Sequence, residues 1–387
     1  MSRKKRPSPY GPTQKDVAAA LGLAQTTVAL ALNPKYQHRY SPQTVRRIQE
    51  KARELGYRPQ RHAQIMRGAN TRVVGILVHL GFFESSRQKL DELIIAFREL
   101  DYSPVVAEIT WFQRNLEAAI NYLLDNSVQG LVVVNVAQPC DLTPILMRNL
   151  PVVLLNCNLQ SLSLPSVNES IEEGFLQLTR HHIAQGSRYL VQCGNQRSTD
   201  PVHNQTLGYT VRERLTGFIK AIHQAGGTIE FDFAGYDLAP LVAETLASLP
   251  KPKRRFRGLK GKIFAPPLSP ERQNIFDVGR YAAHTLMCGA NPPDSVVCDN
   301  DDLAIGFLRG CLDLGIAVPR QVRLSGYDAS TAGAYAAVPL TTYRAHNALL
   351  AKRAAQLLVA MHNRQPVGEP NQRVPGELIV RESTVIH

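Results

Sequence analysis

Three polar side chains in the second half of the chain have the chemistry needed to hold a small polar molecule. They are Arg212, Asn300 and Asp328, which supply a forked cation, an amide and a carboxylate. An arginine fork binds two acceptor atoms at once, a carboxylate accepts hydrogen bonds from hydroxyl groups, and an amide can do both. Asn300 and Asp328 follow the apolar runs 295–298 and 322–326. These residues therefore favour a binding site for a polyhydroxyl or heterocyclic ligand.

Each of the three residues also has an ordinary structural interpretation, which the sequence leaves open. Arg212 suits the exposed face of a helix. Asn300 suits the N-terminal cap of the helix that follows it, and Asp328 suits a loop that its carboxylate would order.

Residue patterns typical of catalysis are missing from the sequence. The chain contains no Gly-Lys-Ser/Thr phosphate loop, no Gly-x-Ser-x-Gly elbow and no spaced histidines and cysteines for a metal. His181 and His182 are adjacent, and adjacent residues on a helix point apart. The six cysteines are scattered without paired spacing, which favours thiols in a reducing cytoplasm. We therefore expect no enzyme activity, no catalytic residue, no metal site and no cofactor.

The elements that must position the polar residues alternate along the body of the chain. Apolar runs predict strands at 73–78, 104–109, 130–134, 151–155, 188–192, 229–233, 262–265, 295–298 and 322–326. Helical patterns predict helices at 85–100, 114–125, 171–185, 211–225, 277–288, 302–314 and 347–362. This alternation indicates an α/β fold with parallel sheets built from βαβ units. Such sheets bind ligands at the carboxyl ends of their strands.

A small basic head precedes this body. Residues 1–72 contain 15 Lys and Arg against three acids, so the whole net charge of +12 lies in this fifth of the chain. The run Arg3-Lys4-Lys5-Arg6 alone would indicate a solvated tail. The patterned segment that follows makes a phosphate-binding domain the better interpretation.

Three short helices are predicted in the head. Thr13 caps the first helix, Gly22 ends it, and a second helix runs over residues 24–32. The third begins at Ser41-Pro42 and ends at Gly56. Two helices joined by a glycine turn make a helix-turn-helix, whose second helix enters the major groove of DNA. The side chains expected at the DNA are Gln25, Thr26 and Ala29 at base edges, and Thr27 and Arg39 at phosphates.

Neither a signal peptide nor a membrane span is predicted. The basic start is not followed by an apolar run, and no apolar stretch approaches the length of a membrane-crossing helix. A cytoplasmic protein without a membrane partner is expected.

The order of these features resembles the lactose-repressor/galactose-repressor (LacI/GalR) family of transcription regulators. The matching residues are Thr13, Asp16-Val17-Ala18, Gly22, Thr27-Val28, Asn33, Ser41-Pro42, Thr44, Leu55-Gly56-Tyr57, Pro59, Ala63 and the terminal run 377–384. The resemblance implies a helix-turn-helix head joined by a hinge helix to a bilobed, periplasmic-binding-protein-like body of two parallel-sheet α/β lobes.

The resemblance also implies domain boundaries. The DNA-binding head would span 1–58, the hinge 59–71, and the effector-binding and dimerisation body 72–387. Within the body, the first lobe would take 72–168 and 344–371, and the second 169–343 and 372–387. Met66 lies where relatives place an intercalating Leu. The further residues that the resemblance places at the DNA are Thr13, Asn33, Arg61, Ala63 and Met66.

Several segments of the body resemble the effector site of the family. Residues 211–218 look like the segment whose first Arg meets the effector, and 298–304 like the one that supplies an Asn or Asp to the cleft. Gly326-Tyr327-Asp328 looks like the segment whose Asp accepts ligand hydroxyls. The residues expected at the effector are Phe82, Phe83, Asn156, Arg212, Asn274, Asn300 and Asp328.

The sequence departs from the family pattern in four places. The recognition helix has Ala29-Leu30 where members often have Ser-Arg, and the loop 33–41 is longer than usual. The loop 79–84 lacks the usual Asn-Pro-Phe. Residues 237–270 contain an insertion with the basic run 251–257, for which an exposed loop is a better interpretation than a DNA contact.

The expected function is sequence-specific transcription regulation by a homodimer, as a repressor on a pseudo-palindromic double-stranded operator. A small polar effector in the cleft, a sugar or a related metabolite, would modulate DNA affinity. Two alternatives stay open: a ligand-independent regulator, whose cleft Phe82 and Phe83 would fill, and a solute-binding receptor of the same fold. The basic head argues against the receptor.

Overall fold

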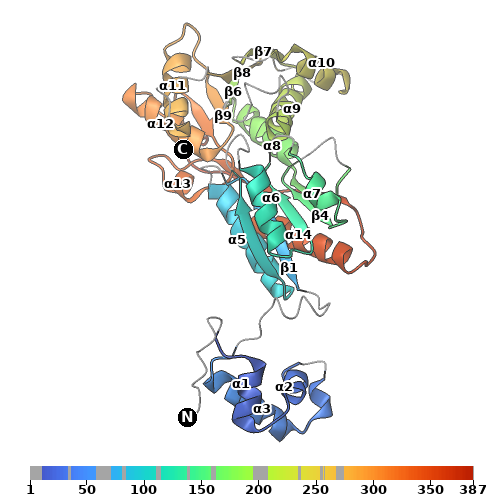
Figure 1. Ribbon diagram of the computed structural model, residues 1–387. Helices are drawn as coiled ribbons and strands as arrows, with labels where there is room; N and C mark the ends of the chain where they lie inside the picture. Colours follow the sequence, from blue (N-terminus) through green and yellow to red (C-terminus); the bar gives the residue numbers. More distant parts are fainter. Residues whose placement is uncertain are drawn as a thin grey trace. The chain divides into compact units, whose positions relative to one another are not determined.

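The structure is a computed structural model, which describes residues 11–33, 36–57, 71–80, 84–109, 115–136, 140–157, 163–194, 208–233, 237–252, 256, 258–266 and 274–386. The chain divides into two units, Met1–Thr71 and Arg72–His387 (Figure 1). The predicted hinge at 59–71 lies almost wholly outside the described residues and stays a prediction.

The first unit contains the predicted helix-turn-helix. Its helices are α1 (Gln14–Leu21), α2 (Gln25–Ala31), the 3-10 helix η1 (Gln37–Arg39) and α3 (Pro42–Glu54). Gly22 ends α1 at φ 65°, a left-handed conformation that glycine adopts without strain. Ser41 caps α3 by accepting a hydrogen bond from the Thr44 amide at 3.2 Å. Residues from all three α-helices close the small core: Val17, Ala18, Val28, Ala31, Ile48 and Ala52.

The first lobe of the second unit is built on a six-stranded parallel sheet. Its strand order is β12 (Asn371–Val374), β5 (Ser166–Glu169), β4 (Val152–Leu155), β3 (Leu131–Val134), β1 (Val73–Val78) and β2 (Ser103–Glu108). The helices α5 (Glu84–Glu99) and α14 (Asn347–His362) cover one face. The helices α6 (Leu116–Asp125) and α7 (Thr143–Leu146) cover the other. Because both faces are covered, β1, β3 and β4 are apolar throughout.

The second lobe is built on a five-stranded parallel sheet. Its strand order is β10 (Arg323–Ser325), β9 (Ser295–Cys298), β6 (Tyr189–Cys193), β8 (Lys260–Ala265) and β7 (Thr228–Phe233). One face packs on α11 (Ile275–Met287) and α12 (Asp301–Asp313). The other packs on α9 (Tyr209–Gln224) and α10 (Ala239–Ala247), with the end of α8 (Ile171–Ala184). The short helix α13 (Thr331–Ala334) follows β10.

The chain crosses between the lobes near a small two-stranded sheet. Its strands β11 (Thr342–Arg344) and β13 (Glu377–Ile379) run antiparallel. A stack of aromatic rings is buried beside it: Tyr327 lies 5.3 Å from Phe175 and 5.4 Å from Tyr343, between ring centroids. These contacts anchor the crossings to the second lobe.

The predicted fold class is confirmed, with the strand at 73–78 and the helix at 347–362 matching to the residue. Patterning missed β5, β12, α7, α10 and α13. The strand β12 pairs with β5, so the first lobe extends to Val374 and the boundary expected at 371/372 would divide this strand. In the described parts of the chain, no helix combines the length and apolar character needed to cross a membrane.

Candidate functional site

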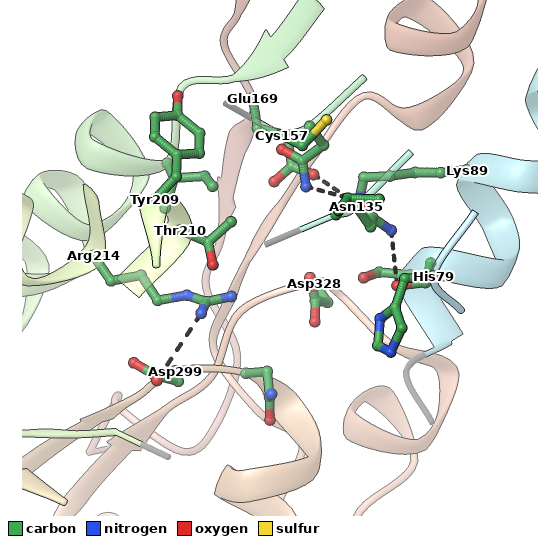
Figure 2. Close-up of a pocket in the computed structure, with 16 residues that line it drawn as sticks. His79, Lys89, Asn135, Cys157, Glu169, Tyr209, Thr210, Arg214, Asp299 and Asp328 are labelled. Carbon is green, nitrogen blue, oxygen red and sulfur yellow. Dashed lines mark hydrogen bonds and ion pairs between the residues drawn. The ribbon is translucent and has the colours of Figure 1, made fainter. Parts of the chain in front are cut away.

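A polar pocket lies where the carboxyl ends of both parallel sheets meet (Figure 2). Sixteen residues line it: His79, Ser85, Ser86, Lys89, Asn135, Val136, Asn156, Cys157, Glu169, Ile171, Tyr209, Thr210, Arg214, Asp299, Asn300 and Asp328. The first lobe contributes the ends of β1, β3, β4 and β5 and the start of α5. The second lobe contributes α9 and the ends of β9 and β10. The pocket therefore occupies the place that sheets of this topology offer to a ligand.

Three of the strand-end residues adopt a left-handed backbone conformation. Asn135, Asn156 and Asp328 have φ values of 55°, 52° and 103°. Asn and Asp tolerate positive φ better than most residues, and such conformations cluster at binding sites. The Asn156 amide donates to Asn135 Oδ1 at 3.2 Å, and the Asn135 amide donates to Ser86 Oγ at 2.9 Å. The first lobe thus presents an ordered row of amides to the pocket.

A buried ion pair also lies in the pocket wall. Lys89 Nζ is 2.7 Å from Glu169 Oε1, and the side chains are 3% and 4% exposed. Tyr327 donates a hydrogen bond to Glu169 Oε2 at 3.4 Å. Sequence reasoning missed both charged residues. The signal was available for Lys89, which precedes the buried Leu93 by four residues and so lies on the apolar face of α5.

Arg214, not Arg212, supplies a guanidinium to the pocket. Its Nη1 lies 4.0 Å from Asp299 Oδ2, and among the described residues its buried Nε has no hydrogen-bond partner. Asp299 Oδ1 accepts a hydrogen bond from Gln192 at 2.5 Å. Arg212 instead forms an ion pair with Glu244 of α10 at 2.5 Å, with 42% of its side chain exposed. The structure therefore does not bring Arg212 to the pocket.

Asn300 combines the two roles that the sequence left open. Its Oδ1 accepts a hydrogen bond from the Leu303 amide at 2.8 Å, which caps α12, and the residue also lines the pocket. The cap holds the side chain in one orientation at the pocket wall. Asn300 can therefore contact a ligand without first losing rotamer freedom.

Asp328 is an acid of the pocket with a shifted pKa. Burial raises the pKa of its carboxyl group to about 7, against the opposing effect of Lys89. No hydrogen bond of this carboxylate to another described residue is found. Asp328 lines the pocket, and the geometry leaves it available to a ligand. Its role at the effector stays a prediction.

The structure describes two of the other predicted effector residues, Asn156 and Asn274, and they lie in different places. Asn156 lines the pocket. Asn274 lies elsewhere, where it caps α11 by accepting from the Asp277 amide at 2.9 Å. Phe82 and Phe83 lie outside the described residues.

In the head, the predicted base-reading residues lie on the accessible side of α2. Gln25 and Thr26 are exposed at its first turn, while Thr27 and Ala29 are half-buried. Arg39 is exposed, with its guanidinium 5.1 Å from the centre of the Tyr36 ring, and Asn33 is exposed. The Thr13 hydroxyl donates to Asp16 at 2.7 Å. Arg61, Ala63 and Met66 lie outside the described residues.

Comparisons with known proteins agree in both sequence and fold. A model of the periplasmic binding protein-like domain matches residues 270–384. Over 378 residues the chain is 23% identical to the HTH-type transcriptional repressor CytR of Escherichia coli (strain K12), a match that covers 96% of each protein. It is 24% identical to the HTH-type transcriptional repressor PurR of Pasteurella multocida (strain Pm70), covering 96% of this chain and 98% of that protein.

Two solved structures extend the likeness to the fold. The lac repressor dimer bound to operator and the anti-inducer ONPF superposes with a TM-score of 0.72 at 20% identity, covering 97% of this chain and 100% of that chain. The complex of the transcriptional regulator CelR with cellobiose gives a TM-score of 0.59 at 23% identity, covering 96% and 99%. The likeness thus includes both the head and the body.

Proposed function

We propose that the chain is a member of the lactose-repressor/galactose-repressor family and that it represses transcription from an operator that it binds as a homodimer in the cytoplasm. The observation that carries this proposal is the full-length likeness to repressors, which spans the helix-turn-helix head as well as the body. A receptor that binds only solutes needs no DNA-binding domain, so the head argues against that function. The relatives named above are regulators, and we assign no reaction to this chain.

The head supports recognition of DNA sequence. Gln25 and Thr26 are exposed at the start of α2, the part of a recognition helix that faces base edges. Gln pairs with adenine through two hydrogen bonds, and Thr offers a methyl group to thymine. A homodimer reads two half-sites, so the operator is expected to be pseudo-palindromic. Arg61, Ala63 and Met66 remain the proposed contacts of the hinge.

The pocket supports a small polar effector. Arg214, Asn300 and Asp328 offer a fork of donors, an oriented amide and a carboxylate, and Asn156 adds a second amide. This set suits a sugar or a related polar metabolite. CelR, which has the same fold, was solved with cellobiose. Closure of the lobes around the effector would couple ligand binding and DNA binding, typically by about 1–3 kcal/mol.

The test uses the full chain and starts with DNA. Selection from a randomised duplex library should enrich one pseudo-palindromic sequence, whose affinity is then measured by fluorescence anisotropy. A pool without an enriched sequence would contradict a sequence-specific regulator. The variant Gln25→Ala, prepared in parallel, reports whether enrichment depends on α2.

A thermal-shift panel of sugars, nucleosides and polyols then tests for the effector. A ligand present at 100 times its Kd should stabilise the chain by roughly 2.7 kcal/mol. The same ligand should change affinity for the selected operator. Operator binding without any ligand response would favour the ligand-independent regulator.

A further inference from the structure

One arginine of the first lobe holds a helix of the second. Arg373 lies on β12, the edge strand of the six-stranded sheet. Its Nη1 is 2.6 Å from Glu213 Oε2, and its Nη2 donates to Glu213 Oε1 at 3.1 Å. Glu213 lies on α9, so this forked ion pair joins the two lobes directly. Forked pairs are stronger and more directional than single contacts, because both groups are planar.

The same guanidinium reaches residues that line the pocket. Arg373 Nη1 also donates to the backbone oxygen of Glu169 at 3.3 Å. Its Cζ lies 5.5 Å from the centre of the Tyr209 ring, within the range of a cation–π interaction. Glu169 belongs to the first-lobe wall of the pocket and Tyr209 to the second-lobe wall. Glu213 directly precedes Arg214 on α9. One side chain therefore contacts elements of both walls.

The surroundings make this ion pair stronger than a fully exposed pair. Glu213 is only 15% exposed, although Arg373 is 49% exposed. The hydrogen bonds with Glu213 raise the pKa of Arg373, which keeps the guanidinium charged. The lobes also meet where Glu84 accepts hydrogen bonds from the Thr331 amide at 3.3 Å and from the Thr331 hydroxyl at 3.1 Å. Neither Glu84 nor Thr331 lines the pocket.

We infer that Arg373 is a positioning residue of the pocket, which sets the separation of its two walls by tying α9 to the edge of the first sheet. The inference rests on the proposed function, because it assigns the separation to effector binding. If the tie is lost, α9 is held to the first lobe by fewer contacts and the lobes sample wider openings. An effector would then have to close the lobes as it binds, which lowers its apparent affinity.

The inference can be tested without knowing the effector, by measuring the distance between the lobes. Spin labels are attached through unnatural amino acids at Lys352 on α14 and Glu230 on β7, both exposed positions. The labelled full chain is diluted with an excess of unlabelled chain, so that pairs within one chain dominate. Double electron–electron resonance then compares the wild type with Arg373→Met, which keeps an unbranched apolar stem but removes the fork. A matched control is Arg280→Met, because the Arg280–Asp313 pair has a 2.6 Å contact and 55% and 14% exposure, but lies within the second lobe.

The expected result is a distance distribution that broadens and shifts to longer values in Arg373→Met but not in Arg280→Met. The charge-swapped double variant Arg373→Glu/Glu213→Arg should restore a narrow distribution, because it restores the ion pair. If the single variant only disturbed local packing, the swap would not restore it. If Arg373→Met fails to fold, Glu213→Gln replaces it. An unchanged distribution, or equal broadening in the Arg280→Met control, would overturn the inference. Because neither DNA nor effector is present, this failure is distinct from failure of the proposed function.

Discussion

Arg212 and Arg214 lie two positions apart on α9, and their surroundings assign them different roles. Arg214 lies in the pocket beside Asp299, whereas Arg212 is paired with Glu244 outside it. We predict that Arg214→Met weakens effector binding by about 1.5–3 kcal/mol, or roughly 10- to 150-fold in Kd, because a charged donor is lost. Arg212→Met is the control and should bind like the wild type. Calorimetry with the compound found in the thermal-shift panel measures both. Equal losses in the two variants would contradict the assignment.

Asp328 gives the folded chain a pH dependence with a defined sign. Burial raises its pKa to about 7, whereas an unfolded chain titrates this group at about 3.9. Between these values the folded chain keeps a proton that the unfolded chain releases, so the group's contribution to stability is lost as the pH rises through this window. Asp328→Asn cannot titrate. The free energy of unfolding of the variant minus that of the wild type should therefore increase by roughly 2–4 kcal/mol from pH 4 to about pH 8 and then stay level.

Urea denaturation of both proteins at several pH values measures this difference. Parallel stability profiles across the whole range would show that the Asp328 carboxyl group titrates normally.

Gln25 is the residue of α2 whose contribution to DNA recognition is easiest to isolate. It is exposed at the first turn of the helix, and no buried contact depends on it. Gln25→Ala should cost about 1–3 kcal/mol and relax base preference at one position in each half-site. Binding to a library of single-base operator variants tests this. If the variant keeps the base preferences of the wild type, Gln25 does not read a base.

At the scale of elements, packing of α11 on α12 depends on two glycines. A Cβ on Gly306 would lie 2.1 Å from the Phe276 backbone oxygen, and one on Gly279 would lie 2.1 Å from the Leu303 backbone oxygen. Gly306→Ala should therefore force the helices apart and lower the free energy of unfolding by about 1–3 kcal/mol. Gly289→Ala is the control, since its nearest atoms would be 3.5 Å away, and should change stability by less than about 0.5 kcal/mol. Thermal unfolding measures the stability of the two variants. Equal stabilities would show that α11 and α12 do not need a glycine at position 306 to pack closely.

Sequence patterning predicted the elements in which all residues share one environment, because the same residue type then extends along the whole element. Central strands such as β1 and β3 are covered on both faces and are apolar throughout, so their positions were evident. The strands β5 and β12 were missed because they lie at one side of the sheet and carry polar residues. No local pattern says that residues 371–374 pair with 166–169, since tertiary contacts decide it.

The pocket residues also divide into those that the local sequence indicates and those that it does not. Asn300 and Asp328 were found because they follow predicted strands, and parallel sheets place such residues together. Lys89 and Glu169 were missed because charged residues are usually exposed. The position of Lys89 on the apolar face of α5 indicates that it is buried. Neither segment indicates that Lys89 pairs with Glu169, which lies 80 residues further along the chain.

At the scale of the whole molecule, the positive charge is concentrated in the head. The excess of 12 charges lies within residues 1–72, and Arg46 and Arg47 are exposed on α3. We predict that operator affinity falls steeply with salt, because cationic contacts to phosphates release counterions. An Arg that contacts one phosphate should, when replaced by Gln, reduce the slope of log K against log salt by about 1. Arg46→Gln and Arg47→Gln are compared with Arg98→Gln on α5. A slope that changes equally in the Arg98 variant would show that net charge, rather than contact, is responsible.

The first lobe is completed by the last part of the chain, and this has a consequence for biosynthesis. The strand β5 ends at Glu169, but its neighbour β12 begins only at Asn371. A ribosome needs roughly 10–40 s to make the residues between them. Until α14 (Asn347–His362) is made, late in that interval, the nascent lobe exposes the apolar face that this helix covers. Premature termination before residue 347 is therefore expected to give a chain that aggregates or is degraded, even though its head was made first.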